Sequence, residues 1–211
     1  AMLMQALLSI NMFVMIRVFS INSNADLING TYGIYYKIQQ IALFSCFGLS
    51  NTIISLLSFN VGLNDISRIK QCIKWGIIDT VIVAAIITIL FECLAGPIAQ
   101  LFGLTATGEN KDTIINLCKT SIRIASIGYV FMGISLAIQG ILQAYRKSVT
   151  PLIISFLRLI VLLVPFALIF VYNDNALKIV WFSFPIAEFL TAIISILILM
   201  IHYKKNVTVN N

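Results

Sequence analysis

The chain has 211 residues, of which 60% are hydrophobic and only 10% are charged, and its formal net charge is +6. Soluble domains are about 45–50% apolar and about 25% charged, so a soluble fold of this composition would lack the polar side chains that cover its surface. With a mean hydropathy of +1.00, the chain is expected to lie in a membrane. Its basic residues occur at the ends of apolar runs and not on one solvated face, which argues against nucleic-acid binding.

Six apolar runs follow one another along the chain, each long enough for a transmembrane helix, which needs about 20 residues. The runs and the short tail after them cover residues 1–21, 38–61, 75–102, 113–144, 151–172, 179–201 and 204–211. The segments between the runs are rich in Asn, Asp, Gly, Lys and Arg, which are typical of turns and of the membrane interface. Because the runs lack the alternation of barrel strands, residues 1–203 are predicted to form an all-α, polytopic membrane lobe of six transmembrane helices.

The positive charges are unevenly divided between the two sides of this predicted bundle. The turns after the second and fourth runs and the tail hold seven basic residues: Arg68, Lys70, Lys74, Arg146, Lys147, Lys204 and Lys205. The opposite side holds Lys111 and Lys178, with Lys37 at a span edge. Since cytoplasmic loops carry an excess of Lys and Arg, we expect both termini and the tail to be cytoplasmic.

Polar side chains recur at helical spacing inside several of the predicted spans. A stripe on the second span comprises Gln40, Phe44, Phe47, Asn51, Ser55 and Ser58. Further polar positions on the first and fourth spans are Gln5, Ser135, Gln139 and Gln143. In hydrocarbon, such residues either hydrogen-bond between packed helices or line a hydrated cavity, and the sequence leaves both interpretations open.

Arg158 and Glu188 are the charged residues that stand furthest from the span ends. A lone charge at that depth is costly unless it is paired or hydrated. The two residues lie on consecutive spans, so they can pair, either as a static packing contact or as cavity charges that meet a substrate or a coupling proton. The candidate cavity residues are therefore Gln5, Gln40, Asn51, Ser135, Gln139, Gln143, Arg158 and Glu188.

Two prolines, Pro165 and Pro185, fall within the fifth and sixth spans. Each removes a backbone hydrogen bond and is expected to kink its helix, either as a passive packing feature or as part of a gate. The chain has no nucleotide-binding loop, metalloprotease motif or nucleophile elbow, so nothing in it points to an enzyme. Its four cysteines lack metal-ligand spacing, which argues against a zinc site or a disulfide framework.

Several short motifs occur in an order that resembles the second half of the multidrug and toxic compound extrusion (MATE) transporters. The motifs are Tyr32-Gly33-Ile34, Asn51, Ser58-Phe59-Asn60-Val61-Gly62, Arg68-Ile69, Gly140-Ile141-Leu142-Gln143-Ala144, Arg158, Pro165 and Trp181-Phe182-Ser183-Phe184-Pro185-Ile186-Ala187-Glu188. The resemblance covers essentially the whole chain. It implies a transporter of twelve helices in two six-helix lobes, of which this chain would be the C-terminal lobe. It also implies that the transporter exports cationic or amphipathic drugs in exchange for Na⁺ or H⁺ across a bacterial cytoplasmic membrane.

The resemblance also implies a partner, and the sequence departs from the family's pattern at one point. The partner would be the N-terminal six-helix lobe of the same transporter, or a second copy of this chain as a homodimer, and no cofactor is expected beyond the coupling ion. Some branches of the family carry acidic cation ligands on the helices that correspond to the first and fourth spans, but the first span has no carboxylate and the fourth has none after Asp112. The alternatives are a lipid-linked oligosaccharide flippase of the wider superfamily and an inactive fragment or half-size scaffold.

Overall fold

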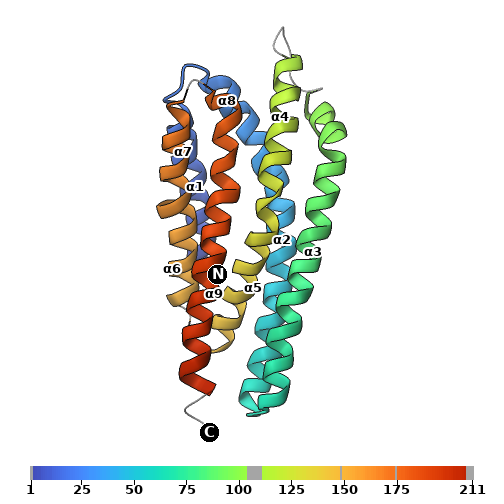
Figure 1. Ribbon diagram of the computed structural model, residues 1–211, viewed down its shortest axis with the longest axis vertical. Helices are drawn as coiled ribbons and strands as arrows, with labels where there is room; N and C mark the ends of the chain where they lie inside the picture. Colours follow the sequence, from blue (N-terminus) through green and yellow to red (C-terminus); the bar gives the residue numbers. More distant parts are fainter. Residues whose placement is uncertain (1, 104–110, 148, 174, 208–211) are drawn as a thin grey trace.

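The computed structural model describes the backbone of residues 2–103, 111–147, 149–173 and 175–207. It also describes the side chains of these residues, except those of residues 2–5, 102–103 and 203–207. Regular structure in the described residues is helical throughout. The helices are α1 (Met2–Phe19), α2 (Ala25–Gly62), α3 (Ile66–Gly103), α4 (Lys111–Ser126), α5 (Gly128–Ala144), α6 (Val149–Phe156), the π-helix η1 (Leu157–Leu162), α7 (Leu163–Val171), α8 (Ala176–Ile179), the 3₁₀-helix η2 (Val180–Phe182) and α9 (Ser183–Val207). They form long upright rods packed side by side (Figure 1).

The apolar character of these rods matches a membrane protein. In the described part of the chain, α2, α3, the α6–α7 rod and the α8–α9 rod are long and apolar enough to cross a bilayer, and α4 with α5 makes a fifth span if the bent pair is counted as one. The described apolar part of α1, Ala6–Phe19, is shorter. The prediction of an all-α, polytopic membrane bundle is confirmed.

Three helices extend beyond the spans expected from hydropathy. α2 begins at Ala25 and not near residue 38, α3 begins at Ile66 and not near residue 75, and α9 continues to Val207 into the predicted tail. Hydropathy marks the part of a helix that lies in hydrocarbon, whereas the backbone hydrogen bonds continue into the interface, where polar side chains remain solvated. Tyr32 and Tyr35, from the early part of α2, are buried in the bundle.

Two tight turns close the bundle at one end. Each follows a helix with a residue in the left-handed region, Asn64 (φ 54°) after α2 and Arg146 (φ 61°) after α5. Backbone N–H groups of Asp65 and Lys147 donate to carbonyls five residues earlier, at 3.3 and 3.0 Å, which is the hydrogen bonding of a Schellman motif. Both turns and the C-terminal end of α9 lie at the same end of the rods (Figure 1).

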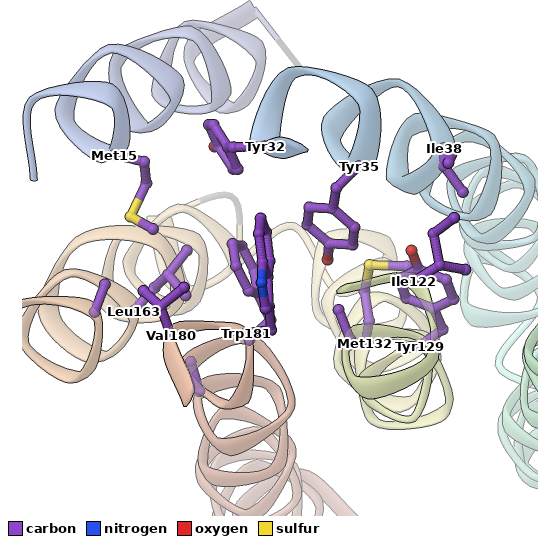
Figure 2. Packing of buried hydrophobic residues seen from close by; sticks show 14 of the residues in the cluster. Met15, Tyr32, Tyr35, Ile38, Ile122, Tyr129, Met132, Leu163, Val180 and Trp181 are labelled. Carbon is purple, nitrogen blue, oxygen red and sulfur yellow. The ribbon is translucent and has the colours of Figure 1, made fainter. Parts of the chain in front are cut away.

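The core is richest in aromatic residues near the opposite end, where α1, α2 and α9 meet. Tyr35 packs against both Trp181 and Phe184, whose ring centroids are 5.8 and 4.8 Å away, and Figure 2 shows Tyr35 next to Trp181. α5 runs between α2 and α9 and is buried along most of its length. This packing holds the elements on which the polar residues lie.

Candidate functional site

A small polar cavity, of about 20 Å³, lies between α1, α2, η1 and α9. Its polar lining consists of Asn11 from α1, Tyr36, Gln39 and Gln40 from α2, Arg158 from η1 and Glu188 from α9. A cavity needs roughly 10–15 Å³ to accommodate a water molecule, so this one has room for about one. The cavity is therefore a polar site inside a largely apolar bundle.

Arg158 and Glu188 form an ion pair at this cavity. The distance from Arg158 Nη1 to Glu188 Oε2 is 3.7 Å, and the two residues are only 4% and 8% exposed. Within the part of the chain that the structure describes, Arg158 Nε and Nη1 and Glu188 Oε2 have no hydrogen-bond partner. A buried ion pair is stable only when its remaining donors and acceptors are also satisfied, so the pair has capacity for a water or another polar ligand.

Arg158 lies where the fifth span changes its helical geometry. The Leu163 N–H donates to the carbonyl of Arg158, five residues earlier, in the wide turn of η1. Pro165 follows two residues later; it has no N–H and its ring crowds the carbonyl four residues before it, so the preceding turn widens to relieve the contact. The predicted effect of Pro165 thus takes the form of a π-helix next to the buried charge.

A hydrogen bond from α1 stabilises this wide turn. Asn11 Nδ2 donates to the carbonyl oxygen of Leu159 at 2.6 Å, and Asn11 is 5% exposed. A backbone carbonyl has two lone pairs, so it can accept this bond in addition to a bond within its own helix. Asn11 therefore connects α1 to η1 beside the ion pair.

We expect Asn11→Leu to destabilise the protein by about 1 kcal/mol, because the substitution removes this buried hydrogen bond between α1 and η1. SDS-induced unfolding in mixed micelles, followed by circular dichroism, measures this change. Asn116→Leu is the control, since Asn116 is exposed on α4 and its replacement is expected to change stability by about 0.5 kcal/mol or less. Equal effects of the two substitutions would contradict the role given to Asn11.

The fourth and sixth spans are also interrupted close to Glu188. α4 and α5 meet at an angle of 44° around Ile127, and η2 precedes Pro185 in the first turn of α9. A Cβ atom on Gly128 would lie 3.1 Å from Pro185 Cα, so the bend brings the two backbones into close contact. The sequence prediction placed a kink at Pro185 but not the bend in the fourth span.

The structure distributes the predicted cavity residues over several environments. Gln40, Arg158 and Glu188 meet at the cavity. Ser135 and Gln139 are buried in α5, where Gln139 Oε1 accepts a hydrogen bond from Ser155 Oγ at 3.0 Å.

The other predicted residues are not part of the cavity lining. Gln143 is half-buried near the end of α5, and Asn51 is exposed on α2. Gln5 lies on α1, but its side chain is outside the described residues. Sequence reasoning missed Asn11, Tyr36 and Gln39; the isolated asparagine in the first apolar run is the signal that could have identified Asn11.

The polar stripe predicted on α2 is exposed over its second half. Asn51, Ser55 and Ser58 all project from the described bundle. Ser55 Oγ donates to the carbonyl of Asn51 at 3.1 Å, so that hydroxyl is satisfied by its own helix. The carboxamide of Asn51 has two donors and an acceptor that one helix carbonyl cannot satisfy.

A polytopic helical bundle with interrupted helices next to a buried polar site is typical of secondary transporters. The model of the MatE family matches residues 1–169. The chain therefore belongs to the MatE family, whose members are membrane transporters and not enzymes, and the resemblance noted in the sequence is confirmed.

Relatives and solved structures agree with this assignment. The fold is similar to that of multidrug resistance MATE family transporters of the MOP superfamily, in an inward-facing conformation (TM-score 0.85, 18% identity, 96% of this chain and 46% of that chain) and in an outward-facing one (TM-score 0.86, 20% identity, 96% and 44%). It is equally similar to a MOP superfamily transporter from Pyrococcus furiosus (TM-score 0.86, 20% identity, 95% and 44%). A FAD transporter of Shewanella oneidensis is 22% identical over 162 residues, which are 77% of this chain and 34% of that protein. The chain thus spans about a third of the curated relative and under half of the solved transporters.

Proposed function

We propose that this chain is the C-terminal six-helix lobe of a secondary active exporter that exchanges cationic or amphipathic drugs for Na⁺ or H⁺ by alternating access. Its partner is the N-terminal lobe of the same transporter; a second copy of this chain is the alternative. The share of the solved transporters that the chain covers, under half, supports the assignment to one lobe. The exposed polar stripe on α2 is the observation that carries the proposal.

The polar stripe on α2 faces either lipid or a hydrated cavity. Asn51, Ser55 and Ser58 are exposed on a helix that is long and apolar enough to cross the bilayer. Facing lipid, the Asn51 carboxamide would leave hydrogen-bonding groups unsatisfied in hydrocarbon. Facing a hydrated cavity between two lobes, the same groups are solvated and can contact a substrate, which is how a transporter uses such a surface.

The orientation follows from the ends of the rods. The turns after α2 and α5 lie at one end of the bundle together with the C-terminal end of α9 (Figure 1). The second turn carries Arg146 and Lys147, and Arg68 lies next to the first one, in the opening turn of α3. The positive-inside rule therefore supports placing this end, and both termini, on the cytoplasmic side of the bacterial membrane.

The similarity to a FAD transporter favours a second candidate substrate class, anionic aromatic molecules. The buried Arg158 is the cation that such a substrate would meet, but Glu188 lies 3.7 Å from it and balances its charge. For this reason we place cationic substrates first. Parallel efflux assays with ethidium and with a flavin nucleotide distinguish the two candidates.

The test is efflux from a pump-deficient bacterial host that expresses the full-length protein. We expect ethidium efflux that depends on a Na⁺ or H⁺ gradient, and we expect Asn51→Leu to reduce its rate about tenfold, because a cavity-facing carboxamide is replaced by an alkyl group. Ser45→Ala is the matched control on α2, since the Ser45 hydroxyl donates to the Ile41 carbonyl of its own helix at 2.9 Å. Absence of efflux of either substrate under both gradients would overturn the proposed function.

A further inference from the structure

A second cavity lies on the opposite side of α2, away from the ion pair. It occupies about 270 Å³ between α2 and α3 and shares no lining residue with the Arg158–Glu188 cavity. Its walls are mostly apolar, with Leu49, Ile53 and Leu56 from α2 and Trp75 from α3. The carboxylate of Asp79 belongs to the same lining.

Asp79 is an unusual residue at this position because it interrupts the apolar run of α3. It is exposed, and within the residues that the structure describes it takes part in neither of the two salt bridges and in no side-chain hydrogen bond. Glu92 on the same helix differs, since its Oε1 accepts a hydrogen bond from Ser126 Oγ at 2.9 Å. A carboxylate at the edge of a membrane span that has no partner in its own chain has the charge to bind a cation.

Trp75 supplies a second feature suited to cations. It is 56% exposed and lies one helical turn before Asp79, so both side chains project from the same face of α3. The Lys74 ammonium nitrogen is 5.9 Å from the Trp75 ring centroid, so the ring already attracts a cation of the chain. An indole face next to a carboxylate is a combination that recognises organic ammonium ions.

We propose that this groove, formed by Leu49, Ile53, Leu56, Trp75 and Asp79, binds an organic ammonium ion that carries an apolar chain. The ammonium group contacts Asp79 and the Trp75 ring, and the alkyl chain lies against the leucine and isoleucine side chains of α2. The groove is a lateral site outside the polar cavity, at which an amphipathic cation is collected from the membrane. The substrate class rests on the proposed function, whereas the site rests on the groove itself.

The depth of the charges favours an alkylammonium over a phospholipid headgroup. Asp79 lies about 6 Å further along α3 than Trp75, at about 1.5 Å per residue, and further from the basic residues that begin the helix. In a phospholipid, the phosphate is nearer to the acyl chains than the amine is. An ethanolamine headgroup in the groove would therefore bring its phosphate, and not its amine, to the level of the Asp79 carboxylate.

The test uses contact quenching of Trp75 by dodecylpyridinium, with the full chain in phosphatidylcholine nanodiscs. We expect saturable quenching and competition by dodecyltrimethylammonium, with Asp79→Asn raising the half-saturating concentration about tenfold. Trp75→Phe should remove the saturable signal, because Trp181, the second tryptophan of the chain, is 1% exposed. Glu92→Gln is the matched control and should leave the half-saturating concentration unchanged.

Three results would overturn the inference. The first is quenching that is not saturable, or that is equal in the wild type and in Asp79→Asn. The second is equal competition by the uncharged dodecanol, which would make the groove a site for alkyl chains only. The third is equal competition by phosphatidylethanolamine, which would assign the groove to a lipid headgroup. Because the readout is binding, it can fail while drug efflux is present, and efflux can fail while binding is present.

Discussion

Arg158→Ala is expected to destabilise the protein by about 3–5 kcal/mol, because it leaves the Glu188 carboxylate buried without its partner. Arg158 and Glu188 are only 4% and 8% exposed, and the nearest oxygen of Glu188 is 3.7 Å from Arg158 Nη1. SDS-induced unfolding in mixed micelles measures the loss. The effect is expected to exceed that of any other single substitution described above.

A double substitution separates the effect of the ion pair on stability from the effect of side-chain volume. Arg158→Met with Glu188→Leu removes both charges, and we expect its cost to be smaller than that of Arg158→Ala, since no unpaired charge remains. Arg123→Ala removes an exposed cation of α4 and should change stability by about 0.5 kcal/mol or less. The single variants Arg158→Met and Glu188→Leu complete the comparison. If the loss of stability in the double variant equals the sum of their two losses, the charges do not stabilise each other.

The same residues test the role of the cavity in transport. Glu188→Gln keeps the size of the side chain and removes its charge, so it preserves most of the packing. We expect this variant to lose gradient-driven efflux in the pump-deficient host. Intact efflux in both Glu188→Gln and Arg158→Ala would show that the ion pair is a packing contact without a part in transport.

Gly140→Ala is expected to cost about 2–3 kcal/mol, because α2 and α5 are in close contact at this position. A Cβ atom on Gly140 would lie 2.5 Å from Ser50 Oγ and 2.9 Å from the Ser50 carbonyl oxygen. Ser50 Oγ donates across the helices to the Leu136 carbonyl at 2.9 Å, and the added methyl group would displace it. Thermal unfolding of the purified protein in detergent measures the cost.

Gly48→Ala is the matched control for this prediction. A Cβ atom on Gly48 would have nothing within 4 Å, so the substitution adds no overlap. In a helix, alanine is favoured over glycine by about 1 kcal/mol, and we expect a small gain in stability. A similar loss in both variants would mean that the close contact between α2 and α5 does not determine the cost.

Much of the architecture follows from local sequence because each span is a property of its own residues. An apolar run of sufficient length must be helical in lipid, since no other local structure satisfies its backbone. The basic turn residues predict which ends lie together, and they do so in the structure (Figure 1). The helix ends were less predictable, because the helical backbone of α2 continues through Asn, Asp and Gly residues that hydropathy assigns to a loop.

The polar site was only partly predictable. Gln40 on its stripe, and Arg158 and Glu188 as isolated charges, were identified from spacing and composition, and the structure brings these three to one cavity. Ser135 and Gln139 follow the same helical spacing but are buried in the packing of α5. Periodicity defines a face of a helix, but it does not say whether that face meets another helix, a cavity or lipid.

The sequence by itself determined that this protein is a helical membrane protein of the MatE family, because hydropathy and the order of the motifs are properties of the chain itself. Only the tertiary structure decided that the buried charges meet at 3.7 Å, that Asn11 binds the π-helix next to them, and that Asn51 faces outward while Gln139 faces inward. These facts depend on the rotation and the approach of one helix relative to another. That rotation is fixed by packing between residues far apart in the chain, such as Gly140 against Ser50, and such contacts leave no local pattern in the sequence.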